Sequence, residues 1–511
     1  MSSGPGHDTS TGPIAAPPLD GGTAWLNVAR PLSWAALRGK VVLLDFWTYG
    51  CINCMHLLPD LRVLEERFRH ELVVIGVHSP KFTNERNTDN LRRILVRYQI
   101  EHPVVQDAEL RIWRAYGGRS WPTRVIVDPA GQLVGTAQGE GNLQGFVQAI
   151  ATVIRVFDER EEVNRSPLPI ALERDRLSDS PLLFPGKVLA DPRSDRLFIS
   201  DSNHNRIVIA TPGGTVVDTL GSGLIGDADG IVSQARFHRP QGLVLDRSSL
   251  YVADTENHQV RVVDLEAGVV ETVAGTGRQS PWSSEGGEAT EVDLNSPWDL
   301  ALKPGILIVA MAGSHQLWVV DLVNGQAYPY AGSGQEARRD GGVGDAAFAQ
   351  PSGLALEGTT LYVADAESNV VRTVALPPVN EVTTLAGGDL FEFGDVDDTG
   401  DGARFQHPLG VAVSDGLVYV ADTYNHKIRV LDPRTRRVRT LAGSGIAGFA
   451  DGRGTRAQFS EPGGLSEANG HLFVADTNNH AIRRIAIATG EVDTLAFEGL
   501  APPGAWSYLR R

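Results

Sequence analysis

The chain has 511 residues, of which 42% are hydrophobic and 21% are charged, and its formal net charge at pH 7 is −16. This length and composition predict a globular protein of about two to four domains. No apolar run approaches the ~18 residues that a membrane helix needs, so we expect no contact with a membrane. The net negative charge falls on residues 166–511, which excludes nucleic acid as a partner of that part, because phosphate binding needs a basic surface.

Residues 1–22 are predicted to be a disordered N-terminal tail. The tail is rich in Ser, Gly, Thr and Pro, and it lacks the basic start and apolar core of a secretory signal. The chain has two cysteines, Cys51 and Cys54, which argues against a disulfide-stapled secreted protein. We therefore expect a cytoplasmic protein that works in a reducing compartment.

Both cysteines lie at a junction between a predicted strand and a predicted helix. Residues 23–28 are predicted to form an edge strand, and the apolar residues 41–46 a buried one. Leucine and phenylalanine then recur at helical spacing, which predicts a helix over residues 51–70. At the start of a helix, unpaired N–H groups and the helix dipole favour a thiolate at Cys51 more than at Cys54. Disulfide exchange needs this asymmetry, because one sulfur attacks and the other resolves.

Strands and helices continue to alternate up to residue 157. The predicted elements are a strand over 72–77, a helix over 88–98, a short helix over 109–116, strands over 124–127 and 132–137, and a helix over 142–157. Residues 128–131 carry Pro and Gly at turn positions between the last two strands. Residues 158–180 have no clear period and are predicted to be a linker.

Several of these residues, taken in order, resemble the thioredoxin superfamily. Asp45 lies six residues before Cys51, as the buried aspartate of thioredoxins does, and Pro59 lies five residues after Cys54, like their helix-kinking proline. Residues 120–123 resemble the cis-proline loop that faces the cysteine pair in that fold. The insertion before this loop resembles the oxidoreductases related to TlpA more than minimal thioredoxin.

The resemblance implies a role for each of these residues. Cys51 is the implied nucleophile that forms a mixed disulfide with a client protein, and Cys54 is the resolving thiol. Asp45 is implied to accept the proton of Cys54, and burial between apolar strand residues should raise the pKa of its carboxyl, which suits that role. An extended client peptide would pair with the backbone of the cis-proline loop. The residues implied to bind it are Trp121, Pro122 and Thr123.

Other interpretations of the cysteine pair stay open. A redox-inert fold with two buried thiols is one, and residues 52–53, which replace the Gly-Pro of thioredoxin, leave it open. The spacing of Thr48 and Cys51 also fits half of a peroxiredoxin motif, but the proline of that motif would have to lie at Leu44. The reduction potential of thioredoxin cannot be assigned to this cysteine pair, because a difference of tens of millivolts separates a reductant from an oxidant.

No cofactor and no metal site are predicted. A zinc site needs more ligands than the two cysteines and His56 supply, and no second cysteine or histidine pair lies near them. His56 is therefore predicted to be a solvated helix residue, and residues 81–90 a solvated loop.

From residue 181 onward, six units repeat with a period of 53 to 57 residues. Their anchoring positions are Asp201, Asp254, Met311, Asp365, Asp422 and Asp476, and a proline keeps step at Pro185, Pro240, Pro297, Pro351, Pro408 and Pro462. In the second unit, short strands are predicted over 242–245, 250–253, 259–264 and 269–274. Four short strands per unit, repeated radially, predict a six-bladed β-propeller.

The repeated Asp-Thr-x-Asn-His-x-(Ile/Val)-Arg pattern resembles the NHL repeat. A thioredoxin-like domain followed by NHL repeats resembles the family of NHL-repeat-containing protein 2 and its bacterial relatives, over about residues 23–497. One departure is Gly50, where the animal relatives carry an additional cysteine; their further β-rich C-terminal domain is not expected here. Asp254, Asn257 and His258 recur in most units, so we expect them to fix turns, because a catalytic group is needed only once. Met311 marks the least regular unit.

The predicted fold class is multidomain, with an α/β thioredoxin fold followed by an all-β six-bladed NHL β-propeller. The predicted boundaries are a tail over 1–22, the thioredoxin-like domain over 23–157, a linker over 158–180, the propeller over 181–497 and a C-terminal tail over 498–511.

The leading functional hypothesis is a thiol–disulfide oxidoreductase module joined to a propeller that binds a protein client or a disulfide-bearing partner. A second hypothesis is a scaffold for protein–protein interaction whose thioredoxin fold is redox-inert. A third is an enzyme that works in the propeller channel and is regulated by the redox domain.

Overall fold

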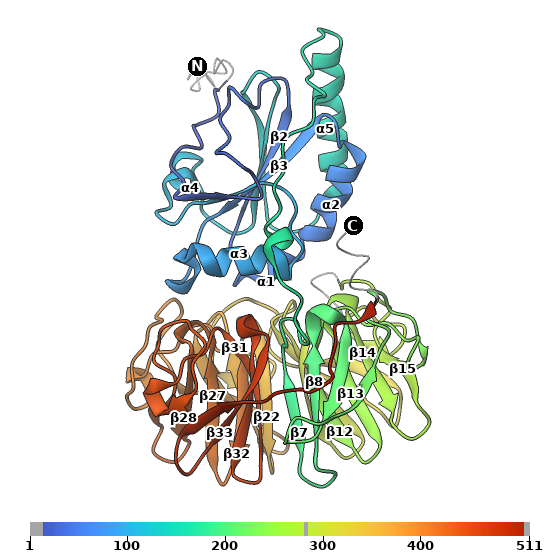
Figure 1. Ribbon diagram of the computed structural model, residues 1–511, viewed down its shortest axis with the longest axis vertical. Coiled ribbons are helices and arrows are strands. Elements are labelled where there is room, and N and C mark those ends of the chain that lie inside the picture. The colour runs from blue at the N-terminus through green and yellow to red at the C-terminus, as the bar shows by residue number, and fades with distance from the viewer. Residues whose placement is uncertain (1–13, 281–284, 505–511) are drawn as a thin grey trace, which may run out of the picture. The chain divides into compact units, whose positions relative to one another are not determined.

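The computed structural model describes residues 14–280 and 285–504, and the boundary between its two compact units falls between Leu177 and Ser178. Both units are drawn in Figure 1. Of the predicted tails, residues 1–13 and 505–511 lie outside the described residues. The prediction of disorder up to residue 22 is wrong for Ala16 and Leu19, which are buried in the core of the first unit. Across the described ranges, every helix is too short or too polar to cross a bilayer.

The first unit is built on a six-stranded mixed sheet of order β1-β4-β3-β2-β5-β6. Its strands are β1 (Ala24–Leu26), β2 (Val41–Trp47), β3 (Leu72–His78), β4 (Val104–Gln106), β5 (Thr123–Val127) and β6 (Leu133–Gln138). Its helices are α1 (Ile52–Met55), α2 (Leu58–Arg67), α3 (Thr88–Arg97), α4 (Arg111–Ala115) and α5 (Leu143–Asp158), with 3-10 turns η1 (Asn84–Arg86) and η2 (Glu173–Arg176).

The centre of this sheet is apolar on both faces. Strands β2, β3 and β4 run parallel, and β5 runs antiparallel to β2. Every residue of β2 and β3 is buried, as expected for parallel strands covered on both sides. Figure 1 shows α2 and α5 on one side of β2 and β3, and α4 on the other. The predicted alternation of strands and helices is therefore confirmed.

The helix predicted over residues 51–70 is two helices. Helix α1 ends at Met55, and α2 begins at Leu58 with Pro59 in its first turn. Proline has no N–H to donate to the carbonyl of Met55, four residues earlier, and its ring also crowds that carbonyl. The chain therefore turns after α1, and the cysteines lie on a short helix of their own.

The second unit contains six antiparallel sheets, one for each repeat. Their strands, innermost first, are β7 (Val188–Asp191), β8 (Arg196–Asp201), β9 (Arg206–Ala210) and β10 (Val216–Leu220); β12 (Pro240–Asp246), β13 (Ser249–Asp254), β14 (Gln259–Asp264) and β15 (Val269–Ala274); β17 (Pro297–Lys303), β18 (Ile306–Met311), β19 (Gln316–Asp321) and β20 (Gln326–Ala331); β22 (Pro351–Glu357), β23 (Thr360–Asp365), β24 (Val370–Ala375) and β25 (Glu381–Ala386); β26 (Gly410–Ser414), β27 (Leu417–Asp422), β28 (Lys427–Asp432) and β29 (Arg437–Ala442); β31 (Pro462–Ala468), β32 (His471–Asp476), β33 (Ala481–Ala486) and β34 (Glu491–Thr494). Two-residue strands β11 (Gly230–Ile231), β16 (Gly287–Glu288), β21 (Gly341–Gly342) and β30 (Gly452–Arg453) extend four of the sheets.

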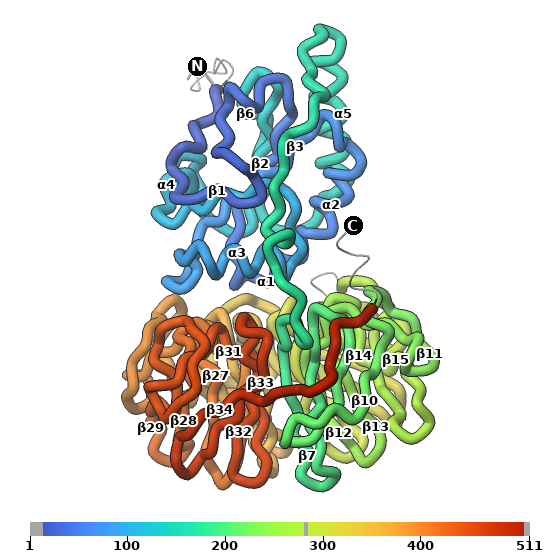
Figure 2. Tube along the Cα trace, viewed as in Figure 1, coloured from blue at the N-terminus to red at the C-terminus, as the bar shows by residue number. Residues whose placement is uncertain are grey.

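The six sheets close into a ring. The innermost strands contact one another in the order β7, β12, β17, β22, β26 and β31, and β31 contacts β7 again. Figure 2 shows this closure, with the red last blade beside the green first blade. The ring leaves only short sheet edges, and each interface between neighbouring blades holds an apolar cluster, such as Phe198 and Ile207 of the first blade against Leu250 of the second. The predicted six-bladed propeller is confirmed.

Candidate active site

Cys51 and Cys54 lie directly after β2, at the start of α1. Cys51 is the N-cap residue, and its carbonyl accepts hydrogen bonds from the N–H groups of Cys54 and Met55 at 3.1 and 3.3 Å. Both cysteines are free thiols, with 4% of Cys51 and 1% of Cys54 exposed. Of the two sulfurs, the one of Cys51 is therefore the one nearer to solvent.

Burial shapes the electrostatics behind the pair. It raises the pKa of the Cys54 thiol well above its ordinary value, and contact with Cys51 and the charge of Asp45 raise this pKa further. Burial also raises the pKa of Asp45 to about 6, against opposing effects from His102 and Arg124. Among the described residues, Oδ1 of Asp45 has no hydrogen-bond partner. The site thus combines a buried thiol with a nearby carboxyl that can take up a proton near neutral pH.

The turn that leads into Cys51 is held by Glu85. This buried carboxylate accepts hydrogen bonds from Thr48 Oγ1 at 2.6 Å and from the Gly50 N–H at 2.8 Å. The N–H groups of Lys81 and Phe82 also donate to it, at 2.6 and 2.9 Å. The prediction of a solvated loop over residues 81–90 is therefore wrong for Glu85, which is fully buried and positions the cysteine-bearing turn.

The predicted cis-proline loop leaves the same edge of the sheet as the cysteine-bearing turn. Thr123 begins β5 opposite Phe46 of β2, and the Trp121–Pro122 peptide bond is cis. The Trp121 ring stacks on Trp113 with a centroid distance of 4.4 Å. In residues 14–280 and 285–504, no loop or turn hydrogen bond engages the backbone of Trp121. Its N–H and C=O are therefore placed at the edge where a bound peptide would pair.

His56 is not the solvated residue that the sequence predicts. Its side chain is nearly buried, and its Nδ1 atom lies 3.2 Å from both carboxylate oxygens of Glu140. Arg124 of β5 donates to the carbonyls of Gly139 and Gly141, in the loop after β6 that also carries Glu140, at 2.9 Å. Within the described part of the chain, no group of three or more His, Cys, Asp or Glu side chains is placed to hold a metal ion.

In the propeller, the repeated acidic residue anchors a network within its own blade. Asp254 accepts hydrogen bonds from the His238 N–H, from Asn257 Nδ2 at 2.7 Å and from Arg261 Nη1 at 2.9 Å. The same carboxylate–arginine pair recurs at Asp365 and Arg372, Asp422 and Arg429, and Asp476 and Arg483. The prediction that the repeated residues fix turns is confirmed.

The repeated histidine joins one blade to the next. His258 Nδ1 accepts a hydrogen bond from the N–H of Ser296 in the next blade. His480 Nδ1 accepts one from the N–H of Phe184, which links the last blade to the first. Asn205 does the same through Oδ1, with the Arg239 N–H as donor. These residues have a positive φ, which Asn and His tolerate better than most side chains.

The third blade replaces the ion pair by an apolar pair. Met311 stands where the other blades have aspartate, and Trp318 stands where most have arginine. Both side chains are buried in the cluster between the second and third blades. A buried ion pair can be exchanged for apolar residues of similar volume at little cost, so this blade stays regular in its backbone although its sequence departs from the repeat.

A lysine crosses the axis of the propeller. Lys187 of the first blade donates from Nζ to Asp299 Oδ2 of the third at 3.0 Å, to the Ser352 carbonyl at 2.9 Å and to the Leu409 carbonyl at 2.8 Å. Asp299 also accepts the Leu354 N–H at 3.0 Å. All three ammonium protons have acceptors, so this buried pair links four blades across the centre of the ring.

Sequence reasoning missed both members of this pair, although the sequence contains a signal for them. The third residue of the innermost-strand motif, counted from its proline, is glycine in four units, and in the other two it is Lys187 and Asp299. Two opposite charges at a position otherwise kept free of side chains indicate a pair that meets in space. No comparable signal marks Glu85, because the cysteine-bearing turn that it holds lies in another segment.

Comparison with known proteins agrees with this architecture. Residues 39–133 match the family model for thioredoxin-like domains, and residues 237–263 and 405–431 match that for the NHL repeat. Thiol-disulfide oxidoreductase YkuV of Bacillus subtilis (strain 168) is 25% identical over 119 residues, which are 23% of this chain and 78% of that relative. The fold and the cysteine site thus define a thioredoxin-like domain, related to thiol–disulfide oxidoreductases, joined to an NHL propeller.

Several relatives match nearly the whole chain, a plant and a bovine protein among them. Protein SUPPRESSOR OF QUENCHING 1, chloroplastic, of Arabidopsis thaliana is 45% identical over 504 residues, which are 94% of this chain and 48% of that relative. NHL repeat-containing protein 2 of Bos taurus is 42% identical over 516 residues, which are 94% of this chain and 71% of that relative. The chain belongs to the family of NHL repeat-containing protein 2, and it spans about half the length of the plant relative.

Proposed function

We propose that the thioredoxin-like domain is a thiol–disulfide oxidoreductase and that the propeller binds its protein client. One observation carries the proposal: the buried thiol of Cys54 lies within the electrostatic influence of Asp45, a carboxyl whose pKa burial raises to about 6. A carboxyl with this pKa is ionised at pH 7 and is still basic enough to take a proton from a thiol. Cys51, the more exposed sulfur, is then the attacking group.

In the reducing direction, the thiolate of Cys51 attacks one sulfur of a client disulfide. A bond forms between Cys51 Sγ and that sulfur, and the other client sulfur leaves as a thiolate. Asp45 then takes the proton of Cys54, and the Cys54 thiolate attacks Cys51 Sγ. This attack breaks the bond between Cys51 Sγ and the client sulfur, so the cysteine pair becomes a disulfide. The client leaves with two more electrons, and its two thiolates take up the two protons that Cys51 and Cys54 have given up. The oxidising direction is the reverse of these steps.

Two further elements support this chemistry. Glu85 holds the turn before Cys51 through the hydrogen bonds of Thr48 and Gly50, which keeps the attacking sulfur in one position. The loop of Trp121, Pro122 and Thr123 offers a backbone edge to an extended client segment beside the cysteines.

The propeller is assigned to client binding, not to catalysis. Lys187 fills the axis where a channel enzyme would bind its substrate, and its hydrogen bonds are complete. The repeated carboxylates are held in blade networks. We expect the protein to act in a reducing compartment such as the cytoplasm, where Cys51 and Cys54 would stay thiols between turnovers.

The test is the reactivity of the cysteine pair in the full-length chain, with Cys51→Ser and Cys54→Ser as companions. We expect a disulfide that forms reversibly in glutathione buffers, and its reduction potential will give the direction of the reaction. Cys54→Ser should trap a mixed disulfide with a disulfide-containing peptide, and Cys51→Ser should trap none. Two unreactive thiols in the native chain would overturn the proposal and leave a redox-inert scaffold.

A further inference from the structure

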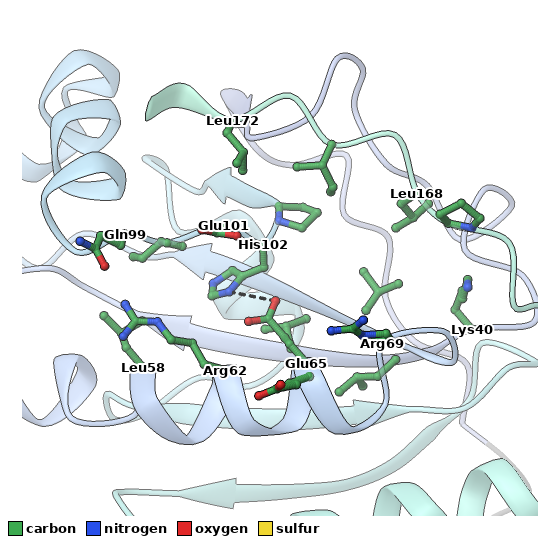
Figure 3. Close-up of a pocket in the computed structure, with 18 residues that line it drawn as sticks. Lys40, Leu58, Arg62, Glu65, Arg69, Gln99, Glu101, His102, Leu168 and Leu172 are labelled. Atoms are coloured by element: carbon green, nitrogen blue, oxygen red, sulfur yellow. Dashed lines mark ion pairs between the residues drawn. The ribbon is translucent and has the colours of Figure 1, made fainter. Parts of the chain in front are cut away.

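One wall of the thioredoxin-like unit contains a cleft of about 770 Å³ that the proposed mechanism has not used. Helix α2, strand β3, residues 99–103 and residues 167–172 line it. Figure 3 shows His102 in the middle of this cleft, facing Glu65 of α2. His102 Nδ1 lies 3.5 Å from Glu65 Oε1. The His102 side chain is 4% exposed and the Glu65 side chain 30% exposed. The pair therefore connects the buried interior to solvent.

The other ring nitrogen of His102 points toward the strand next to Asp45. In the parallel register of β2 and β3, Asp45 lies beside Gly76. A methyl group built on Gly76 would lie 3.4 Å from His102 Nε2 and 2.8 Å from Trp47 Nε1. Because Gly76 has no side chain, ring nitrogens of His102 and Trp47 lie close to the backbone of β3 beside Asp45.

Two polar atoms of the residues beside Gly76 are buried without a hydrogen-bond partner among the described residues. They are Asp45 Oδ1 and Trp47 Nε1. Buried polar atoms without partners are uncommon, and they mark places where a group is kept available for exchange. The backbone that carries the imidazole, in contrast, is fixed by a hydrogen bond, because Asn27 Nδ2 donates to the His102 carbonyl at 2.9 Å.

We propose that His102 is a positioning residue that relays protons between Asp45 and the cleft, past the backbone of Gly76. The proposal rests on the oxidoreductase function proposed above. After Asp45 has taken the proton of Cys54, it passes this proton to His102 Nε2. The proton bound at Nδ1 then leaves to Glu65 or to water in the cleft. Asp45 returns to the carboxylate, and one proton has moved from Cys54 to solvent.

The titratable and charged groups around the relay come from three elements. Arg124 of β5 and Cys54 of α1 interact with Asp45, and Glu65 of α2 faces His102. The charge of His102 lowers the pKa of Asp45, so the two groups are already coupled electrostatically in this fold. Substitution of His102 should therefore be detectable at Asp45 even without any turnover.

The test uses the two-step reaction of the full-length reduced chain with 5,5′-dithiobis(2-nitrobenzoate), followed by stopped flow. Attack by Cys51 releases the first thionitrobenzoate, and resolution by Cys54 releases the second. We expect His102→Gln to leave the first phase unchanged and to slow the second about 10-fold, as for the loss of a proton-transfer group one step from the reacting atom. Added imidazole should restore the second phase in His102→Gly, because the cleft admits it. A purely structural role would show no such rescue.

Glu66→Gln is the matched control, since Glu66 also lies on α2 and lines the cleft but is exposed. It should behave like the parent chain, whereas Glu65→Gln should slow the second phase by a smaller factor than His102→Gln. Glu65→Gln also keeps the proposal testable if His102 variants fold poorly. An unchanged second phase in His102→Gln, with no effect of imidazole on His102→Gly, would overturn the relay.

Infrared titration of the Asp45 carboxyl separates this proposal from the oxidoreductase function. His102→Gln should shift the titration midpoint of Asp45 upward, because a group that lowers this pKa has been removed. If the parent chain releases no thionitrobenzoate at all, the oxidoreductase proposal fails. In that case an upward shift would still support the proton coupling, and an unchanged midpoint would overturn it.

Discussion

Asp45 of the thioredoxin-like unit and Asp254 of the second propeller blade are both fully buried, and burial raises the pKa of each carboxyl to about 6. Their surroundings differ. Asp254 accepts hydrogen bonds on both oxygens, from the His238 N–H, Asn257 and Arg261. Asp45 Oδ1 has none from the described residues, and Asp45 lies beside Gly76 of the neighbouring strand.

This contrast shows that burial and a raised pKa do not by themselves identify a reactive carboxyl. The hydrogen bonds of Asp254 hold its charge in one place, and the same network recurs in other blades, for instance at Asp422 and Asp476. A buried carboxyl without these bonds is unfavourable for folding, so its presence at Asp45 needs another reason. Proton exchange with Cys54 supplies one.

The largest effect is expected in the propeller, at the pair that crosses its axis. Lys187→Gly leaves Asp299 buried without its cation and should lower the free energy of unfolding by about 3 to 5 kcal/mol. Urea unfolding followed by far-UV circular dichroism measures this. The double variant Lys187→Gly/Asp299→Gly copies the glycine of the other four blades and should recover a large part of the loss. Equal losses in both variants would show that the pair does not act as a unit.

Loss of charge at Asp45 and at Asp254 should change the free energy of unfolding in opposite directions. The pKa of Asp45 is about 6 in the folded chain and near 3.8 in a model peptide, so the folded state binds the proton more tightly. The free energy of unfolding should therefore fall as pH rises from about 4 to 6, by about 3 kcal/mol, and stay low above pH 6. Asp45→Asn cannot ionise, so at pH 7 it should be more stable than the parent chain.

Asp254→Asn has the same change in side chain but should be less stable than the parent chain at pH 7, because an amide cannot pair with Arg261. Hydrogen–deuterium exchange along a urea series, read at peptides from β2 and β13, reports on the two units separately. Asp45→Asn should also slow the resolution step about 100-fold. Destabilisation by both substitutions would remove the distinction between a reactive and a structural carboxyl.

A smaller effect is expected at Glu85, which is buried and fully bonded like Asp254 but lies in the reactive unit. Glu85→Gln keeps one acceptor oxygen and loses hydrogen bonds to a charged group, so the unfolding free energy should fall by about 2 kcal/mol. Attack by Cys51 should slow as the turn loosens. Glu109→Gln, at an exposed position, should leave both unchanged. A normal attack rate in Glu85→Gln would mean that Glu85 serves stability alone.

The smallest effect is expected at the link between the last and first blades. His480→Ala removes the acceptor of the Phe184 N–H and should lower the unfolding free energy by about 1 kcal/mol. His480→Asn should cost little, because Asn205 fills the equivalent position in the first blade with a similar positive φ. Thermal unfolding of the three chains compares them. If His480→Ala unfolds at the same temperature as the parent chain, the hydrogen bond between His480 and Phe184 does not stabilise the closed ring.

Local and repeated patterns in the sequence determined the fold class. The apolar run of β2 and the helical spacing after Cys54 predicted the strand–helix junction, because side-chain periodicity follows directly from backbone geometry. Repetition predicted the propeller and assigned Asp254 and its counterparts to structure. The short α1 depended on one residue, Pro59, whose missing N–H ends the helix earlier than periodicity indicates.

Only the tertiary structure decided which side chains meet across long stretches of the chain. Glu85 reaches back 37 residues to Thr48, and Lys187 reaches 112 residues forward to Asp299. The cleft places His102 beside Glu65 and near Gly76, which no spacing rule connects. The contacts of Glu85 and His102 carry no periodic signal, because each arises once from the packing of separate elements. The sequence therefore determined the cysteines and the carboxyl of the candidate site, and the packing determined the groups that hold the turn and border the proton path.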